Sequence, residues 1–388
     1  MSRVSIFGYY GQDNAGDEAI LAAIIAGIKS ASPHSKIAAY SGNPQETEQH
    51  HNIAAFAFFS LSLKSLVIGT LGRKRVRYWK SVINFLRTDL IIIGGGGLYF
   101  DSQESNKWIF RFINLIHMAK FFRKKVALFG ISVGPLHHQE SKDAIAKAFI
   151  HADLISVRDH LSKELLTNLN IPPQHVHVIP DLVFTFNSAP KETVSRILAD
   201  EGIPKDKNIV ALVPCCYNTS KAGWLEQYVH LCEQINAEQD VTLLLVPLQR
   251  HHTFDDLSAA QSIYDHLNEN TKKNTFLLKN NYSPAEVQGV LSEAKFVFAE
   301  RLHGSIMALN TNTPFLGIAY MQKVSGVLEL ANLPDRIIPI DKFLNGNFLI
   351  NAKSTIKNAL EEPVSSHQLN KGIREKAYTN FELLKNLL

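Results

Sequence analysis

The sequence RVSIFGYYGQDNAGDEAILAAIIAGIK, residues 3–29, contains the pattern that decides the fold. A short apolar run at residues 4–7 leads into glycine and polar residues, and a helical pattern follows at residues 17–29. Buried strands of a parallel sheet read as continuous runs of Val, Ile and Leu, each followed by a turn and a helix. The stretch therefore predicts the first βα unit of an α/β domain.

The same pattern recurs along both halves of the chain. Further strands are predicted at residues 90–93, 126–129, 154–157, 209–213, 241–246, 275–278, 296–298 and 315–318, and helices at 224–237, 255–267 and 284–294. An irregular stretch at residues 180–190 separates the halves. We expect two Rossmann-like, doubly wound α/β domains facing a cleft, at residues 1–185 and 186–364. By analogy with such folds, a C-terminal helix at residues 365–388 is expected to pack back on the first domain.

Composition limits the classes of protein that need considering. A length of 388 residues fits two domains at about 100–200 residues each. Hydrophobic residues make up 45% and charged residues 20%, which excludes disordered, collagen-like and coiled-coil chains. The net charge of +4 argues against a broad nucleic-acid surface, so an anionic ligand needs local clusters of cations. The three cysteines form no CxxC pair, which favours neither a disulfide framework nor a zinc site and fits a cytoplasmic location.

The segment at residues 53–80 is the most membrane-like part of the sequence. Its apolar residues end in the basic run RKRVRYWK, and Lys64 interrupts them. One interpretation is a buried strand and helix with a solvated basic end, and the other is a peripheral contact with anionic lipid. The amino terminus lacks the apolar region of a secretory signal. We expect a cytoplasmic protein that works at the inner face of the cell membrane.

The loops after the strands of the first half contain the first candidate site residues. In open α/β sheets ligands bind beyond the carboxyl ends of the strands. The candidates at these positions are Tyr9, Asn14, Asp17, Gly95, Gly96, Ser132 and Arg158. The glycine spacing in residues 8–16 matches neither GxGxxG nor the P-loop, so a nucleotide site of either kind is not indicated. Purely structural alternatives stay open: the glycines serve tight turns, and Arg158 pairs with a nearby carboxylate.

The stretch FVFAERLHGSIMALN, residues 296–310, is the most informative loop of the second half. A strand ends before Arg301 and His303, and Gly304 and Ser305 open a helix. A helix amino terminus beside an arginine favours the binding of an anion, and a histidine there is suited to acid–base catalysis. Tyr320 and Lys323 follow the next strand and could face the same ligand. The alternative for His303 is a buried structural histidine.

Patterns for metal chemistry and acyl transfer are missing from the sequence. The histidine pairs at residues 50–51, 137–138 and 251–252 are adjacent, whereas metal-binding helices place histidines at HxxxH or HExxH spacing. There is no GxSxG elbow. Neither a metal nor a cofactor is expected.

Taken together and in this order, the motifs GYYGQDNAGDEAIL, IIGGGGLYFD, GISVGPL, SVRD and AERLHGSIMAL resemble the polysaccharide pyruvyl transferase family, especially its bacterial cell-surface-anchoring branch. The resemblance implies a fold similar to the GT-B glycosyltransferases. It also implies transfer of the enolpyruvyl group of phosphoenolpyruvate onto two hydroxyls of a sugar, which gives a pyruvate ketal. In that branch the acceptor is a lipid-linked N-acetylmannosamine unit of a secondary cell-wall polymer, and the ketal helps to anchor surface-layer proteins.

The resemblance also implies roles for single residues. His303 matches the histidine of the family's RLHG motif, and Arg158 and Lys323 match its basic residues. From the chemistry of this reaction we expect His303 to act as the acid or to protonate the departing phosphate, and Asp17, with Asn14, to hold or deprotonate the sugar. Two rival functions remain: a GT-B glycosyltransferase that uses a nucleotide sugar, and a non-catalytic polysaccharide-binding protein.

Overall fold

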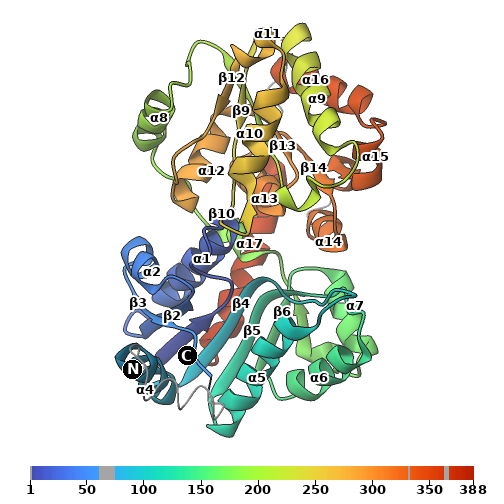
Figure 1. The fold of residues 1–388 in the computed structure, drawn as a ribbon. Helices are drawn as coiled ribbons and strands as arrows, with labels where there is room; N and C mark the ends of the chain where they lie inside the picture. The colour runs from blue at the N-terminus through green and yellow to red at the C-terminus, as the bar shows by residue number, and fades with distance from the viewer. Residues whose placement is uncertain (1, 61–74, 331–332, 362–366) are drawn as a thin grey trace. The chain divides into compact units, whose positions relative to one another are not determined.

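The computed structural model describes residues 2–60, 75–330, 333–361 and 367–388. These residues form two compact α/β units, whose elements are labelled in Figure 1. Unit 1 comprises residues 1–12, 20–182 and 376–388, and unit 2 comprises residues 13–19 and 183–375. Each unit is built on one sheet of parallel strands. The predicted fold class of two Rossmann-like α/β domains is therefore confirmed.

The sheet of unit 1 has seven strands in the order β3-β2-β1-β4-β5-β6-β7. The strands are β1 (Arg3–Phe7), β2 (Lys36–Ser41), β3 (Ala54–Ala57), β4 (Leu90–Tyr99), β5 (Lys125–Val133), β6 (Leu154–Val157) and β7 (Val176–Val178). The helices are α1 (Ala15–Ala31), α2 (Pro44–His51), α4 (Arg75–Arg87), α5 (Lys107–Phe121), α6 (Gln139–Phe149) and α7 (His160–Asn168), and the first turn of α1 is grouped with unit 2. The strand order reverses between β1 and β4, which is the switch point of a doubly wound sheet.

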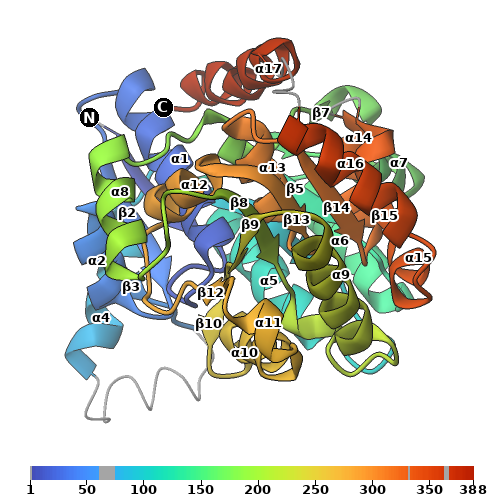
Figure 2. The same cartoon turned by 90° about the horizontal axis from the view of Figure 1, so that it is seen from above.

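The sheet of unit 2 has six strands in the order β12-β9-β8-β13-β14-β15. They are β8 (Asn208–Val213), β9 (Val241–Leu245), β12 (Thr275–Leu277), β13 (Ala294–Ala299), β14 (Phe315–Ala319) and β15 (Ile337–Pro339), and a separate hairpin pairs β10 (Arg250–His251) with β11 (Phe254–Asp255). The helices, seen from a second direction in Figure 2, are α8 (Lys191–Asp200), α9 (Trp224–Glu238), α10 (Asp256–His266), α11 (Glu269–Lys272), α12 (Pro284–Ser292), α13 (Leu302–Asn310), α14 (Gln322–Leu330), α15 (Ile340–Leu344) and α16 (Leu349–Glu361). Here the switch point lies between β8 and β13.

The central strands are apolar because both of their faces are covered. Ile91 and Ile93 of β4 are fully buried against α5, in a cluster that includes the stacked rings of Phe7 and Tyr40, whose centroids are 4.0 Å apart. A second cluster in unit 2 surrounds the buried Trp224. These clusters explain why the strands read as continuous apolar runs.

The four-glycine stretch belongs to a strand and not to a loop. β4 continues through Gly94–Gly97 to Tyr99, whereas the sequence predicted that the strand would end at Ile93. Gly95 has a φ of +72°, and a Cβ there would lie 2.0 Å from Cγ2 of Ile20 on α1. Glycine is required because α1 approaches the strand closely.

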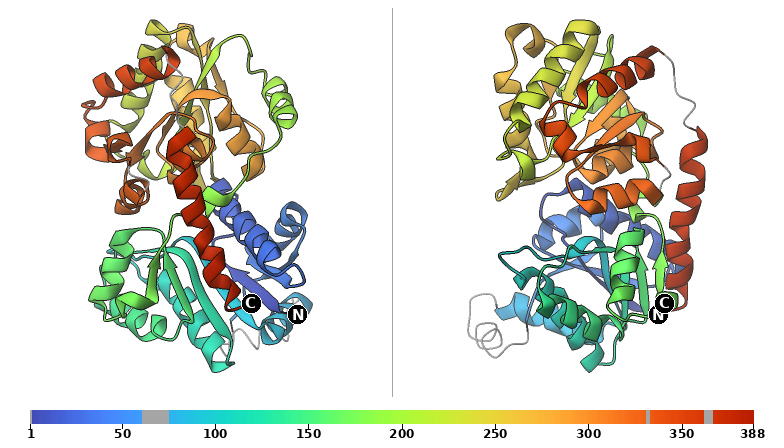
Figure 3. Two further views of the ribbon diagram at one scale, coloured as in Figure 1. Left: turned by 180° about the vertical axis from the view of Figure 1, so that it is seen from behind. Right: turned by 90° about the vertical axis from the view of Figure 1, so that its right-hand side faces the viewer.

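The last helix, α17 (His367–Lys385), carries its final residues into unit 1. The Phe381 ring lies 5.7 Å from the ring of Phe129 on β5, and Asn380 donates a hydrogen bond of 3.3 Å to the carbonyl of Pro180. In Figure 3 this part of α17 runs across the face of the sheet opposite to α5. The end of the chain thus completes the core of the N-terminal half.

The predicted lipid-contacting segment, residues 53–80, is described only at its ends. β3 and the first residues of α4 belong to it, and residues 61–74 lie outside the described residues. Across the part of the chain that the structure covers, every helix is too short or too polar to cross a membrane.

Candidate functional site

The RLHG loop lies at the switch point of unit 2. β13 ends at Ala299 beside Val213, the last residue of β8, so the loops after both strands emerge next to each other. α13 begins at Leu302, which places His303 in its first turn. A Cβ on Gly304 would lie 3.0 Å from Cγ1 of Val213, so the glycine lets the helix start directly on the two strands. This is the position at which open α/β sheets bind ligands.

Arg301 is held firmly beside this helix start. Its guanidinium forms two hydrogen bonds to the Asp256 carboxylate, at 2.8 and 2.7 Å, and a third of 2.8 Å to Oε1 of Gln249. It also lies over the Tyr217 ring, 4.4 Å from the centroid. Burial alone would lower the pKa of Arg301, but the Asp256 charge raises it well above its usual range. Arg301 is therefore a fixed, permanently charged group.

Residues 13–19, which end the loop after β1 and begin α1, are grouped with unit 2 and contact the same region. Asn14 pairs with Gln249 in an antiparallel bridge. The Ala15 amide donates a hydrogen bond of 2.8 Å to the Leu248 carbonyl, and the Arg250 amide donates one of 2.9 Å to the Asp13 carbonyl. The structure thus brings Asn14 next to Gln249, a hydrogen-bond partner of Arg301, although more than 200 residues separate them in the sequence, and Asp17 follows in the first turn of α1.

The first turn of α1 meets the ring of His303. A Cβ on Gly16 would lie 2.0 Å from Nδ1 of His303, so the imidazole packs directly on the Gly16 backbone. Oδ1 of Asn14 caps α1 by accepting hydrogen bonds from the Gly16 and Asp17 amides, at 3.0 and 3.3 Å. His303 therefore lies at the amino termini of two helices, α1 and α13, whose dipoles both favour an anion nearby.

A buried carboxylate shapes the neighbouring loop after β8. Glu300 accepts hydrogen bonds from the Cys215 amide, the Asn218 side chain, Trp224 and Tyr228, at 2.6–3.3 Å. Burial raises the pKa of Glu300, although these hydrogen bonds act in the opposite direction. Glu300 thereby fixes the loop next to Arg301.

The sequence did not predict two residues that belong to this cluster. Asp256 and Gln249 are fully buried and hold Arg301, from 45 and 52 residues earlier in the chain. Gln249 also keeps an enclosed amide nitrogen, Nε2, for which the described residues supply no hydrogen-bond acceptor. The sequence around Gln249, QRHH at residues 249–252, matches no motif that would predict a contact with Arg301, because that contact depends on tertiary structure.

Arg158 and Ser132 lie together in unit 1, in a buried polar network. Arg158 forms an ion pair with Asp181, and its Nε donates a hydrogen bond of 2.8 Å to the Ser132 hydroxyl. Ser132 in turn donates one of 2.8 Å to Asp159, which caps α7 by accepting from the Ser162 amide at 2.7 Å. Arg158 is only 1% exposed, so its charge is matched within the fold.

The remaining predicted residues are dispersed. Tyr9 in unit 1 lies edge-on to Trp108, with ring centroids 5.7 Å apart, while Gly95 and Gly96 lie within β4. Tyr320 at the end of β14 has its ring 6.4 Å from that of Tyr217, and burial raises its pKa well above the usual value.

Two residues predicted near His303 remain. Lys323 lies in the first turn of α14, and its side chain is outside the described part of the structure. Ser305 is fully buried and faces Gly317, where a Cβ would lie 2.8 Å from its hydroxyl. Ser305 therefore faces the interior of unit 2.

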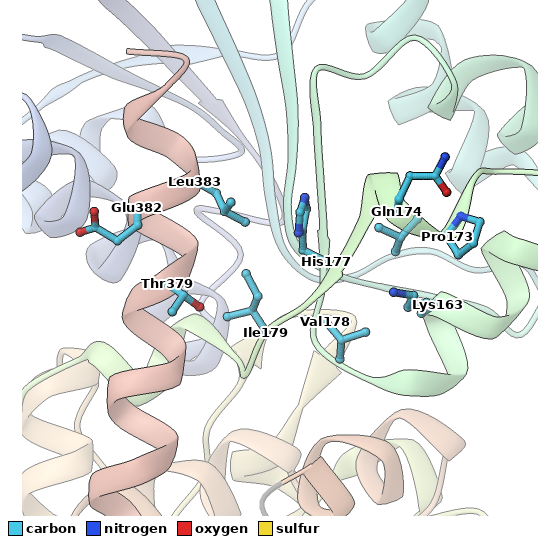
Figure 4. Close-up of a pocket in the computed structure, with 10 residues that line it drawn as sticks. Lys163, Pro173, Gln174, His177, Val178, Ile179, Thr379, Glu382 and Leu383 are labelled. Carbon is cyan, nitrogen blue, oxygen red and sulfur yellow. The ribbon is translucent and has the colours of Figure 1, made fainter.

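A pocket of about 440 Å³ lies in unit 1. Figure 4 shows His177 and Ile179 on one side of it and Thr379 and Leu383 of α17 on the other. The predicted site residues that the structure describes are not among those lining it. Within the described ranges, no three His, Cys, Asp or Glu side chains are grouped to hold a metal ion.

Comparisons with known proteins identify both family and fold. A family model described as polysaccharide pyruvyl transferase matches residues 14–322. The amylovoran biosynthesis protein AmsJ of Erwinia amylovora is 21% identical over 247 residues, which are 61% of this chain and 59% of that protein. The chain thus spans about three fifths of the length of this curated relative.

Similar solved structures share the fold. The UDP-GlcNAc 2-epimerase of Neisseria meningitidis superimposes with a TM-score of 0.61 at 12% identity, covering 100% of this chain and 99% of that one. HepE of Anabaena, in complex with UDP and glucose, gives 0.60 at 11% identity, covering 99% and 96%. A glycosyltransferase of Rickettsia africae gives 0.60 at 11% identity, covering 100% and 96%. The fold is therefore GT-B-like.

Proposed function

Because this chain belongs to the polysaccharide pyruvyl transferase family, we propose that it transfers the enolpyruvyl group of phosphoenolpyruvate onto two hydroxyls of a sugar. The products are a pyruvate ketal and inorganic phosphate. Membership of the family makes the chain a transferase of polysaccharide biosynthesis. The donor, the acceptor and the ketal product are our proposal.

The observation that carries the proposal is the position of His303. Phosphoenolpyruvate bears a phosphate and a carboxylate, so it needs positive electrostatic potential and N–H donors. Two helix amino termini meet at His303, and the guanidinium of Arg301, which is paired with the Asp256 carboxylate, lies two residues before it. Such a setting suits a doubly anionic substrate held next to a proton donor. We place the donor in unit 2 on this basis.

The proposed reaction balances without any further reactant. A proton adds to the methylene carbon of phosphoenolpyruvate, which becomes a methyl group, and positive charge develops at C2. One sugar hydroxyl attacks C2 and loses its proton. The bond from C2 to the phosphate oxygen then breaks, phosphate leaves, and the second hydroxyl attacks C2 and loses its proton. His303 supplies the first proton or protonates the departing phosphate.

Other residues have supporting roles in the proposal. Asp17, in the first turn of α1 beside Asn14, is assigned to the sugar as its hydrogen-bond acceptor or base. We assign Lys323 and Arg158 as further cations that bind the substrates. In this role Arg158 keeps its ion pair with Asp181. All of these groups belong to the chain, so we propose a reaction that uses neither cofactor nor metal ion. Turnover that stops on treatment with EDTA would contradict that part.

We propose a lipid-linked saccharide as the acceptor, such as β-N-acetylmannosamine in a secondary cell-wall polymer. The ketal would then serve to anchor surface-layer proteins, and the reaction would take place at the inner face of the cell membrane. The resemblance of the motifs to the cell-surface-anchoring branch supports this choice. A panel of acceptors with N-acetylmannosamine or galactose at the reacting end tests it.

The decisive experiment measures phosphate release from phosphoenolpyruvate with and without each acceptor. In D₂O the ketal methyl group should carry deuterium, and its absence would refute protonation of the methylene carbon. Replacing His303 with alanine should lower kcat by at least about 10²-fold, the usual scale of an acid–base contribution. Near-normal turnover by this variant would refute the assignment of His303.

The rival function is glycosyl transfer from a nucleotide sugar. The likeness to HepE, solved with UDP and glucose, concerns the fold at 11% identity. The two are separated by offering UDP-glucose in place of phosphoenolpyruvate. Release of UDP without any phosphate release from phosphoenolpyruvate would establish the rival.

A further inference from the structure

Helix α4 presents an apolar stripe to solvent. Val76, Trp79, Ile83 and Leu86 are 62%, 39%, 44% and 43% exposed. Their spacing of three, four and three residues puts them within an arc of about 80° on the helix, at 100° per residue. We call these four residues the α4 stripe.

The stripe is not the face that holds α4 on the protein. Ser81, Val82 and Phe85 are buried, and they lie on a different side of the helix. Phe85 packs edge-on against Phe122, with ring centroids 6.1 Å apart. The carbonyl of Leu86 accepts a hydrogen bond of 2.6 Å from Lys124. These contacts hold α4 on unit 1, and the side chains of the α4 stripe take no part in them.

A further exposed aromatic side chain lies near the end of α4. Phe121, the last residue of α5, is 81% exposed, and its ring lies 5.2 Å from that of Phe122. Since Phe122 contacts Phe85, Phe121 belongs to the same region of unit 1. Exposed apolar side chains that gather on one surface mark interaction sites, whereas scattered single ones are normal.

Basic side chains border the stripe. Arg75, Arg77, Lys80 and Arg87 are all exposed, and the sequence of α4, RVRYWKSVINFLR, contains no acidic residue. Arg73 and Lys74 precede the helix in the sequence. An apolar stripe with tryptophan and a basic border is the pattern of a helix that lies in the interface of an anionic bilayer.

We propose that α4 docks on the surface of an anionic lipid bilayer, with the α4 stripe inserted among the acyl chains and its basic border on the headgroups. A second copy of the chain fits less well. A twofold dimer through this face would bring the two basic borders together, and like charges in an interface repel. Figure 1 shows α4 at the margin of unit 1, next to the edge strand β3. The proposal concerns binding alone and does not depend on the reaction proposed above.

The test uses the full chain with vesicles of phosphatidylcholine, with and without phosphatidylglycerol. Co-sedimentation should occur only with the anionic vesicles, and raising the salt from about 0.1 to 1 M should weaken it, because the Debye length falls from about 10 to 3 Å. Of the three tryptophans, Trp224 is buried and Trp108 is half-buried. A blue shift of the fluorescence on binding should therefore come from Trp79. Trp79→Phe should lose the shift and still bind.

Variants separate the apolar stripe from its basic border. Trp79→Ser with Ile83→Ser should weaken vesicle binding by at least about tenfold. Arg75→Gln, Arg77→Gln and Lys80→Gln should each cost about fivefold, and only with anionic vesicles. Ile350→Ser, at a residue 84% exposed in unit 2, is the matched control and should bind normally. Circular dichroism melts confirm that every variant is folded.

Three results would overturn the proposal. The first is failure of the unaltered chain to bind anionic vesicles. The second is binding that survives both the stripe and the border variants. The third is a dimer in sedimentation velocity that Trp79→Ser with Ile83→Ser dissociates, since that would assign the stripe to a second copy. Phosphate release from phosphoenolpyruvate with a water-soluble acceptor is a separate measurement, so failure of either proposal can be recognised by itself.

Discussion

Gly16 sets the position of the His303 ring, and this contact gives a sharp test of the site. Gly16→Ala would place a Cβ 2.0 Å from Nδ1 of His303, so the ring must move. Since a displacement of about 1 Å can cost about 10²-fold in rate, we expect kcat to fall by at least about tenfold. Steady-state kinetics of phosphate release measure the change.

A double variant distinguishes this effect from general damage to the fold. Once His303→Gly has removed the whole side chain, including the Cβ that would lie 2.8 Å from an alanine Cβ at position 16, Gly16→Ala should cost nothing further. Gly372→Ala, at a helical glycine whose Cβ would meet nothing within 4 Å, is the control. Full activity of the single Gly16→Ala variant would contradict the proposed arrangement.

Gln249 offers a second test at the scale of a single residue. Gln249→Glu keeps an oxygen for Arg301 but replaces the enclosed amide donor with a second carboxylate oxygen. If this donor serves the anionic substrate, KM for phosphoenolpyruvate should rise by about 10 to 100-fold, the scale of a hydrogen bond to a charged group. Gln261→Glu, at an exposed glutamine of α10, should leave KM unchanged. An unaltered KM for Gln249→Glu would remove Gln249 from the site.

The sequence predicted the residues around His303 better than it predicted their partners. Arg301 and His303 were found because a strand end followed by a helix start is a local pattern. Asp256 and Gln249 were not found, because their contacts with Arg301 cross 45 and 52 residues. The sequence left open that Arg158 pairs with a nearby carboxylate, but it did not identify the partner, Asp181, which lies 23 residues away. Short-range spacing carries no information about such pairings.

At the scale of secondary-structure elements, features that depend on residues close together in the sequence are again predicted well. α12, which the sequence predicted at residues 284–294, begins with a capping box of Ser283 and Glu286, whose two hydrogen bonds join residues three apart. The glycines of β4 show the opposite case. The positive φ angles of Gly95 and Gly96 are compatible with a loop, and the need for glycine at position 95 follows only from the approach of Ile20 on α1. That contact cannot be read from the sequence of β4.

We expect the stability of the fold to depend on pH through Asp101, which binds the turn between β5 and α6. Asp101, which follows β4, accepts hydrogen bonds from the amides of His137 and His138. Burial would raise the pKa of Asp101, but the hydrogen bonds from these amides lower it below its usual value. A carboxyl group with a lowered pKa stabilises the fold above its unfolded pKa of about 3.9 and loses that contribution as the pH falls through the folded pKa.

The variant Asp101→Asn measures this contribution. At pH values above about 5 it should lower the free energy of unfolding by about 1.5–3 kcal/mol, the scale of hydrogen bonds to a charged group. The difference from the unaltered protein should shrink as the pH falls below the folded pKa of Asp101. Urea titrations over this range provide the data, with Asp143→Asn, at an exposed carboxylate on α6, as the control. A difference that is constant with pH would show that the charge of Asp101 is not involved.

At the scale of the whole molecule, the sequence predicted two α/β units but not the grouping of residues 13–19. These residues are grouped with unit 2 although they follow β1, whereas residues 376–388 are grouped with unit 1, on which the C-terminal helix was expected by analogy to pack. The bridge between Asn14 and Gln249 illustrates the difficulty, since it joins residues 235 apart. Strand and helix periodicities identify elements, whereas such groupings depend on side-chain packing between distant segments.

The packing of the chain end in unit 1 leads to the last prediction. Phe381 is buried, contacts Phe129 and fills the space over Gly27, where a Cβ would lie 2.0 Å from its ring. Phe381→Ala should therefore destabilise unit 1 by about 3–5 kcal/mol, as expected for a large cavity in a core. Tyr378→Ala, one turn earlier on α17 and 46% exposed, should cost far less. Urea unfolding followed by the fluorescence of Trp108, in a Trp79→Phe and Trp224→Phe background, reports on unit 1. Equal stability of the two variants would mean that the end of α17 does not belong to the core of unit 1.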